Sequence, residues 1–524
     1  MRILHSFLLA LLFVPTAFAT TYYVSNSGGD SSSGTTISTP WQTVSKVNSS
    51  AFNPGDVILF QAGGKWREEV HASSSGSVGL PITFSSYGAG EKPIFDGTDL
   101  LLSGWALDSG NIWKHALSPP YMEHLWVFFN GVAGGPNGGK PETAKVNVNA
   151  PNKWYWEANV LYVYSTSDPA TAFTNPGVEA TARGGFIVAG KHYITVSNLN
   201  VKRTTQSCFD ILDSPHVTVD SSIASYCGKN GIVFYKFASN CDFFTSSNNV
   251  VSYVAESGTT TKDCSHGRIF GNDVSHVGIQ KDDEDAIGTV GASGDNRLYD
   301  NYAHDNMDQI GSVGIRGIEL DTIIGINNVN YVYNNVVARN NGTGIIVEHS
   351  IDQQVYNNIS YDNARGPGSN CCVAGFKDSL GSRNIWTHNT GHHNQFAEME
   401  ITNDSGAGPK LRDNIFSGLR AILANGGTGG STDTDYNLVV GSTLYNWNGT
   451  SYSSPAALFA ATGKGQHDVT GDPLFVDVSA GNFQLRPGSP AIGVSSTGGT
   501  VGAVITTATS GAPDAPTGLK AVVQ

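Results

Sequence analysis

An asparagine recurs along this chain at spacings that never fall below 23 residues, and this repeat constrains the fold more than any other feature. Each of these asparagines follows a short strand-like segment and precedes a small or apolar pair. They are Asn249, Asn272, Asn301, Asn335, Asn358, Asn389, Asn414 and Asn437. Successive spacings are 23, 29, 34, 23, 31, 25 and 23 residues. A constant minimum with a variable excess indicates one repeating unit that carries insertions in a loop.

A repeat of this length predicts a parallel β-helix, in which each unit is one coil of three short strands and three turns. Helical repeats need about 33 residues or more, and leucine-rich repeats need a leucine pattern that is absent here. Asparagine suits a recurring turn because it tolerates the left-handed backbone region. Stacked asparagine amides also form hydrogen bonds from one coil to the next.

Composition supports a strand-and-turn protein and narrows its partners. The 524 residues include 62 glycines and only four methionines, and 14% of them are charged. These values exclude a coiled coil and argue against a helical bundle. The formal net charge is −14, which argues against nucleic-acid binding, since that requires a basic surface. The same charge argues against docking on anionic membranes.

The first residues have the pattern of an export signal. Arg2 precedes an apolar stretch over residues 6–14, and Ala17-Phe18-Ala19 is an A-x-A cleavage pattern. The stretch is too short to span a bilayer, so we expect no membrane insertion. We predict cleavage near Ala19 and a secreted or periplasmic protein, in which disulfides are permitted.

Several segments resemble a known superfamily. They are TYYVSNSGGDSSSGTTISTPWQTVSKV, GDVILFQAGGKWRE and LPITFSSYG near the N-terminus, and GDPLFVDVSAGNFQLRPGSPAIG at 471–493. They are similar to the ends of right-handed parallel β-helix proteins of the pectate-lyase-like superfamily. This resemblance implies an all-β fold and a polysaccharide substrate. It leaves the reaction open, because the scaffold hosts lyases, hydrolases, epimerases and phage depolymerases.

The remaining organisation follows from where the repeat stops. Residues 105–180 depart from it and are rich in Trp and Tyr, so we expect an inserted β element whose aromatic residues form a core. We expect a monomer with the following divisions: signal peptide 1–19, cap and first coils 20–104, insert 105–180, β-helix with its closing segment 181–498, and flexible tail 499–524.

The cysteines predict one disulfide. Cys241 and Cys264 each lie eight residues before a repeat asparagine, Asn249 and Asn272. Equal phase places them one above the other on adjacent coils, about 4.8 Å apart, which is within disulfide reach. The neighbours Cys371 and Cys372 are not expected to pair with each other.

One strand of each coil carries a cluster of charged residues on its outer side. We aligned these strands on their inward apolar residue: Phe209, Ile232, Ile287, Ile318, Ile345, Phe376 and Met399. Because alternate residues of a strand point to opposite faces, the next residue and the third one on point outward. The predicted outward patch consists of Glu319, Asp321, Glu348, Lys377, Glu398 and Glu400. Five carboxylates around one lysine are unusual in a chain with so few charges, and the alternative is a solvated salt-bridge ladder.

The first expected reaction is β-elimination on a uronate polysaccharide. The strand Gly375-Phe376-Lys377 resembles the lysine-bearing strand of family-nine pectate lyases. That resemblance implies Lys377 as the base and Asp285 and Glu319 as calcium ligands, with Asp321 as a further candidate. The acidic run over residues 281–285 adds Asp283 as a possible Ca²⁺ ligand. The chain departs from the family pattern, because it has Glu where the family has Asp, lacks the paired Asp, and has an extra coil carrying Glu348.

The second expected reaction is glycoside hydrolysis. Glu319 and Asp321 point the same way about 6.5–7 Å apart along the strand, near the range of inverting enzymes. Glu348 and Glu400 are further catalytic candidates. Arg316, Glu398 and His349 are expected to bind substrate. The third alternative is a non-catalytic glycan-binding or adhesin protein.

Overall fold

A computed structural model of the chain describes residues 19–118, 124–135, 138–281, 283–306, 314–323, 328–364, 373–402, 407–425, 431–503 and 505. The expected signal peptide before Ala19 lies outside these residues, as do the expected tail beyond 505 and the pair Cys371 and Cys372. No helix in the described part of the chain is long and apolar enough to cross a membrane.

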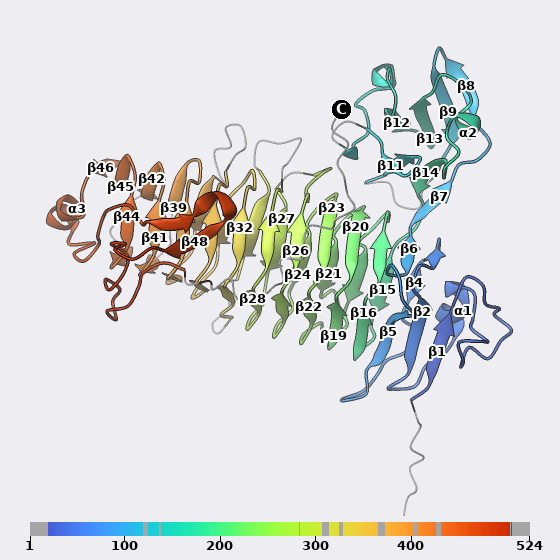
Figure 1. Cartoon of the computed structure of the whole chain (residues 1–524), viewed down its shortest axis with the longest axis horizontal. Helices are drawn as coiled ribbons and strands as arrows, with labels where there is room; N and C mark the ends of the chain where they lie inside the picture. The colour runs from blue at the N-terminus through green and yellow to red at the C-terminus, as the bar shows by residue number, and fades with distance from the viewer. Residues whose placement is uncertain are drawn as a thin grey trace, which may run out of the picture.

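Three long parallel sheets wind along one axis, so the predicted parallel β-helix is confirmed (Figure 1). Sheet A runs β1 (Thr21–Val24), β2 (Val57–Gln61), β5 (Ile82–Tyr87), β16 (Ile194–Ser197), β19 (Val217–Asp220), β22 (Thr245–Ser247), β25 (Arg268–Phe270), β28 (Arg297–Tyr299), β31 (Tyr331–Tyr333), β34 (Gln354–Tyr356), β37 (Ile385–Thr387), β40 (Lys410–Arg412) and β43 (Asp433–Asp435). Sheet B runs β3 (Lys65–Trp66), β6 (Ile94–Asp96), β17 (Asn200–Lys202), β20 (Ile223–Cys227), β23 (Val250–Val254), β26 (Asp273–Ser275), β29 (Tyr302–His304), β32 (Val336–Ala338), β35 (Ile359–Tyr361), β38 (Thr390–His392), β41 (Ile415–Ser417) and β44 (Leu438–Val440).

Sheet C is the face on which the charged patch was expected. It runs β4 (Val70–His71), β15 (Phe186–Ala189), β18 (Phe209–Leu212), β21 (Ile232–Tyr235), β24 (Thr259–Lys262), β27 (Asp285–Val290), β30 (Arg316–Asp321), β33 (Ile345–Glu348), β36 (Ala374–Ser379), β39 (Ala397–Thr402), β42 (Arg420–Asn425), β45 (Thr443–Trp447) and an antiparallel β46 (Thr450–Tyr452). Inward residues of the three sheets form one continuous apolar core.

The eight repeat asparagines form a buried ladder, as their spacing predicted. From Asn272 onward, each side-chain Oδ1 accepts the backbone N–H and the side-chain amide of the asparagine one coil earlier, at 2.9–3.1 Å. The last of them, Asn437, donates in the same way to the Asp468 carboxylate. The ladder thus satisfies turn backbone groups that burial would otherwise leave without partners.

Two more ladders flank the first at an offset of five residues. One contains Asn306, Asn340, Asn363 and Asn394 and ends at the Glu398 carboxylate. The other contains Asn296, Asn330, Gln353 and Asn384 and ends at the Asp378 carboxylate. The constant offset was visible in the sequence, but only the first ladder was predicted from it.

Two disulfides cross-link neighbouring coils. The predicted bridge between Cys241 and Cys264 is confirmed. A second bridge joins Cys208 to Cys227 and was not predicted, because Cys227 lies on β20 while Cys208 lies in the turn before β18.

The segment between β6 and β15 folds into two small antiparallel sheets that project from the solenoid (Figure 1). One sheet contains β7 (Thr98–Leu100), β10 (Val127–Phe129), β11 (Val132–Ala133) and β14 (Val178–Thr181); the other contains β8 (Ala106–Ser109), β9 (Ile112–Ala116), β12 (Trp154–Glu157) and β13 (Val160–Tyr164). η2 (Lys145–Asn147) and α2 (Pro169–Ala172) complete this insert. Trp154 is fully buried in its separate core, and Trp105, Trp113 and Trp156 pack against that core.

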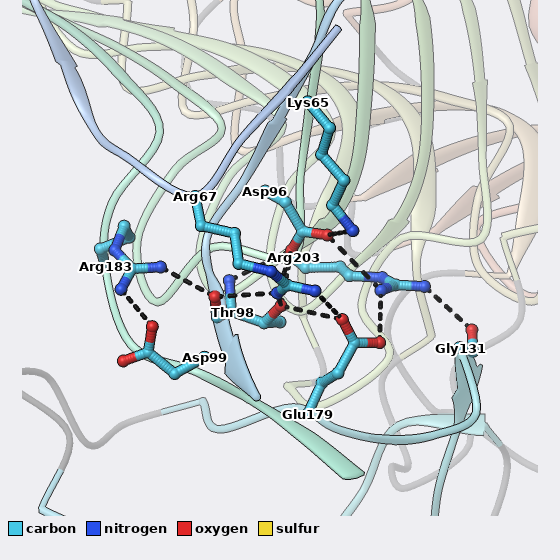
Figure 2. A network of polar contacts seen from close by, with 9 residues as sticks. All are labelled: Lys65, Arg67, Asp96, Thr98, Asp99, Gly131, Glu179, Arg183 and Arg203. Carbon is cyan, nitrogen blue, oxygen red and sulfur yellow. Dashed lines mark hydrogen bonds and ion pairs between the residues drawn. The ribbon is translucent and has the colours of Figure 1, made fainter. Parts of the chain in front are cut away.

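A buried ionic cluster fastens the insert to the solenoid (Figure 2). Glu179 of β14 binds Arg67 at 2.5 Å and Arg203 at 2.8 Å, and both its neighbour Asp96 and Glu179 itself are fully buried. Arg203 also donates to the Gly131 carbonyl and lies over the Phe128 ring. We call Arg67, Asp96, Glu179 and Arg203 the latch.

Both ends of the solenoid are closed by other elements. α1 (Val44–Ser49) begins after Thr43, whose hydroxyl accepts from the Lys46 backbone N–H, and it covers the N-terminal coils with Val44 and Val47. At the other end lie α3 (Pro455–Thr462), η4 (Val478–Ala480) and the hairpin β47 (Phe475–Asp477) and β48 (Asn482–Leu485).

Candidate functional site

The outer face of sheet C presents two columns of side chains, and their register confirms the predicted outward positions. The first column contains Asp210, Val233, Thr260, Gly288, Glu319, Ile346, Lys377, Glu400 and Leu423. The second contains Leu212, Tyr235, Lys262, Val290, Asp321, Glu348, Ser379, Thr402 and Asn425. Five of the six residues of the expected patch therefore lie together on this face.

Arg316, at the start of β30, gathers three carboxylates around its guanidinium. Its Nε lies 2.9 Å from Glu319 Oε1 and 3.5 Å from Asp285 Oδ1, and its Nη1 lies 2.6 Å from Asp283 Oδ1. Arg316, Asp285 and Glu319 are all nearly buried, whereas Asp283 is exposed. From the sequence, a calcium ion was expected between these three acids. The Arg316 guanidinium lies there instead.

Asp285 and Glu319 form a buried pair of carboxyl groups within hydrogen-bonding reach of each other. Burial, together with the negative charge of Glu319, raises the pKa of Asp285 well above its usual range. Burial also raises the pKa of Glu319, although Arg316 opposes the shift. Gly288 leaves room for the pair, because a Cβ there would lie 3.1 Å from Asp285 Oδ2. Two adjacent buried carboxyl groups of this kind titrate as a coupled pair, in which the charge of one favours protonation of the other.

A second acidic group lies beside this pair and retains contact with solvent. Asp321 and Glu348 are register partners on β30 and β33, and both are half-buried. The Nδ1 atom of His349 lies 3.3 Å from Asp321 Oδ1. One ligand atom from each of Asp321, Glu348 and His349 lies within 4.8 Å of the others. Both acids raise the pKa of Glu319 through their negative charge.

The described residues do not fit the calcium site that the resemblance implied. Calcium takes six to eight oxygen ligands. One oxygen each of Asp283, Asp285 and Glu319 faces the Arg316 guanidinium, and Asp321 is grouped instead with Glu348 and with His349, whose nitrogen is not the oxygen ligand that calcium takes.

Lys377 lies two coils beyond Glu319 in the first column, and its Nζ is 3.0 Å from Glu400 Oε2. Both side chains are at least nine-tenths buried. An ammonium group forms such an ion pair, whereas the neutral amine required of a general base has no charge with which to form it.

Glu398 was expected to point outward and to bind substrate, and the expected orientation is wrong. Its side chain is fully buried and accepts two hydrogen bonds from Asn394 at the end of a ladder. Burial raises its pKa well above the usual range. The position just before the inward residue faces the turn interior: at the corresponding Gly375, a Cβ would lie 2.3 Å from the Asn394 Nδ2 atom.

The insert forms an edge of the site that sequence reasoning missed. Trp126 and Phe128 pack against Tyr226 on β20 and against Ala255 and Ile279, which lie between sheet B and sheet C. The side chain of Gln280, five residues before Asp285, donates to the carbonyls of Leu125 and Gly139. These contacts join segments more than 100 residues apart in sequence, which is why local patterns gave no signal for them.

A polar chain continues from the insert to the carboxyl pair. His124 lies 3.0 Å from Glu256, and Lys281 lies between Glu256 at 3.8 Å and Glu284 at 2.6 Å. Glu284 accepts from the Ser257 hydroxyl, which in turn accepts from the Asp285 backbone N–H. The backbone at Asp285 is therefore tied to the insert through side chains.

Comparison with known proteins shows similarity mainly at the level of fold. No protein-family model matches the chain. A structure described as the complex of XylC with xylose has a TM-score of 0.63 and 16% identity, and the match covers 87% of each chain. Pectate lyase Pel9A has a TM-score of 0.46 and 13% identity, over 91% of this chain and 92% of its own. The expected parallel β-helix fold is confirmed.

One sequence relative matches over a short segment. The chain is 34% identical over 108 residues to the lacto-N-biosidase of Bifidobacterium longum subsp. longum. The match covers 19% of this chain and 7% of the length of that protein.

Proposed function

We propose that the chain is a glycoside hydrolase whose active site lies on the outer face of sheet C over β27, β30 and β33. The observation that carries this proposal is the buried pair Asp285 and Glu319 beside the more exposed Asp321 and Glu348. Glycoside hydrolysis needs one carboxyl group kept protonated as acid and another kept ionised as base or nucleophile. Neighbouring carboxyl groups in unlike environments meet that need.

In the proposed mechanism, the pair Asp285 and Glu319 supplies the proton to the leaving oxygen, and Asp321 activates the attacking water. The two residues of β30 are two positions apart, or about 6.8 Å along the strand, which lies at the lower end of the inverting range. Arg316 holds Glu319 and Asp285 in place. The XylC structure with xylose and the short match to a lacto-N-biosidase support a carbohydrate substrate.

β-Elimination with Lys377 as base is the second candidate function. The observation in its favour is that the Arg316 guanidinium contacts Glu319 in the column that also carries Lys377, and two cations would neutralise a uronate carboxylate. Its difficulty is the ion pair between Lys377 and Glu400, because the base would first have to give up its proton.

Purified protein assayed on a panel of neutral and uronate glycans separates the two reactions. Hydrolysis releases reducing ends without a rise in ultraviolet absorbance, whereas elimination produces an unsaturated uronide that absorbs. Under the proposal, Glu319→Gln and Asp285→Asn each lower kcat by about a hundredfold or more, and Lys377→Ala leaves measurable hydrolysis. Glu157→Gln, an exposed glutamate of the insert, is the matched control.

Proton NMR of the first product then tests the stereochemistry. Inversion of the anomeric centre supports Asp321 as base. A rise in absorbance that Lys377→Ala abolishes would instead establish the lyase and refute the hydrolase. Release of reducing ends that is unaffected by Glu319→Gln would refute the assigned acid.

A further inference from the structure

The first column carries a second carboxyl group well away from the proposed acid. Asp210 on β18 is in register, through Val233, Thr260 and Gly288, with Glu319. Four coil steps of about 4.8 Å place the two residues ~19 Å apart along the same face. The three intervening residues are a valine, a threonine and a glycine, so no long side chain of this column lies between the two carboxyl groups.

Asp210 is only partly satisfied by its neighbours. Its Oδ1 atom is buried and has no hydrogen-bond partner among the described residues. Burial raises the pKa of Asp210, although the nearby Tyr235 hydroxyl and the charge of Lys229 oppose the shift. Burial and the Asp210 charge together raise the pKa of Tyr235 to about 12. An under-satisfied buried carboxyl group on an outer face calls for a role outside the core.

Asp210 and Tyr235 nevertheless remain reachable from solvent. Both side chains are half-buried on the outer face of the sheet, and Tyr235 lies diagonally across from Asp210, in the second column. Together they offer a carboxyl group, a phenol hydroxyl and the edge of an aromatic ring. That combination suits the hydroxyl groups and the apolar face of a sugar ring.

The insert lines the space between Asp210 and Glu319 on one side. It contacts the segments that precede β21, β24 and β27, at Tyr226 on β20, at Ala255 and Glu256, and at Ile279 and Gln280. These three strands lie between Asp210 on β18 and Glu319 on β30. The insert therefore packs beside the coils that join the two carboxyl sites.

We propose that Asp210 and Tyr235 form a distal subsite that binds one sugar unit of a glycan chain whose reacting bond lies at Glu319. This inference rests on the proposed function. It identifies the substrate as an oligosaccharide or polysaccharide that spans ~19 Å. It also identifies the sugar unit at the subsite as uncharged, because a uronate there would lie against the Asp210 carboxyl group and lose affinity through like-charge repulsion.

The test starts with binding, using the full-length Glu319→Gln protein so that the ligand is not consumed. A labelled sample is applied to an array of neutral and uronic-acid oligosaccharides. The glycan that binds is then titrated calorimetrically as a series from disaccharide to octasaccharide. Asp210→Asn and Tyr235→Phe are each introduced into the same background. Asp295→Asn and Tyr299→Phe are the controls, because they make the same chemical changes at sites outside sheet C.

The expected result is a dependence on chain length. Asp210→Asn and Tyr235→Phe each weaken binding of the longest oligosaccharides by about tenfold, which corresponds to the loss of one good hydrogen bond. Binding of the disaccharide stays unchanged, and both control variants behave like the parent. In the active protein, each change lowers kcat/KM for the long substrate and leaves kcat/KM for the short one unaltered.

The failures of the two proposals are distinguishable. Equal binding by parent and variants at every length overturns the subsite alone, provided that the active protein still hydrolyses the disaccharide. An equal loss at every length also overturns it, since it would place Asp210 at the reacting end. Binding of uronic-acid chains only overturns the uncharged sugar. An array with no bound glycan overturns the subsite together with the proposed function.

Discussion

Removal of the Glu179 charge is expected to loosen the insert, because this residue is the centre of the latch. Its two oxygens bind Arg67 and Arg203 separately, at 2.5 and 2.8 Å (Figure 2), and Glu179 itself is fully buried. Glu179→Gln keeps the shape of the side chain and removes its charge. Asp96 is then the one latch carboxylate that balances the guanidinium groups of Arg67 and Arg203. Breaking a buried ion pair on one side costs about 3–5 kcal/mol. Because Arg67 is partly exposed, we expect the lower end, about 3 kcal/mol.

Tryptophan fluorescence during urea denaturation measures this loss. Trp126 and Trp154 are buried in the insert and its interface, so they report on its unfolding. Glu157→Gln, an exposed glutamate of the same insert, should change the free energy of unfolding by less than about 0.5 kcal/mol. A double-mutant cycle with Arg203→Met should give a coupling energy of at least about 1 kcal/mol. A change within 1 kcal/mol for Glu179→Gln, with no coupling to Arg203, would refute the account of the latch.

Two further predictions concern the main ladder. Burial raises the pKa of Asp468 to about 6. Between about pH 4 and pH 6 the folded protein therefore binds a proton that the unfolded chain has released. As the pH rises through this range, the free energy of unfolding falls by up to ~3 kcal/mol. Thermal melting across this range should show the fall, and Asp468→Asn should flatten it; an unchanged profile would contradict the assignment. Asn358→Ala removes donors to Val332, Tyr356 and Asn389 and the acceptor of Asn335, and should cost about 2–4 kcal/mol in urea denaturation. A loss below 1 kcal/mol would show that the ladder does not stabilise the coils.

The repeat carried most of the information about the fold. A strand that alternates between core and outer face fixes its own register, so the outward positions of Glu319, Asp321 and Lys377 could be predicted from the sequence. Equal phase within the repeat likewise predicted the bridge between Cys241 and Cys264. Both features are local to one coil or to two adjacent coils.

Features that depend on side-chain direction at a strand end were less predictable. Glu398 stands where earlier coils have Gly317, Gly344 and Gly375, and each of those glycines faces the interior of a turn. Reading that column of glycines as an inward position would have placed Glu398 correctly. Arg316 lies among Asp283, Asp285 and Glu319 because β27 and β30 pair in one particular register, across a loop whose length the repeat does not fix. The insert reaches the site through contacts that depend on the tertiary fold alone.

The ladders also have a direction. Along the main ladder, one N–H of each asparagine amide donates to the next coil toward the C-terminus, and the side-chain oxygen accepts from the coil before, so this series of hydrogen bonds has one direction. Its final partner must accept without donating, and all three ladders end on carboxylates: Asp468, Glu398 and Asp378. A coil duplicated within the ladder would join the chain without disturbing it, whereas one added after the carboxylate would find no amide to continue from. Only the main ladder runs to the last coils, whereas the two flanking ladders end on Asp378 and Glu398 and the solenoid continues beyond them through β42 and β45.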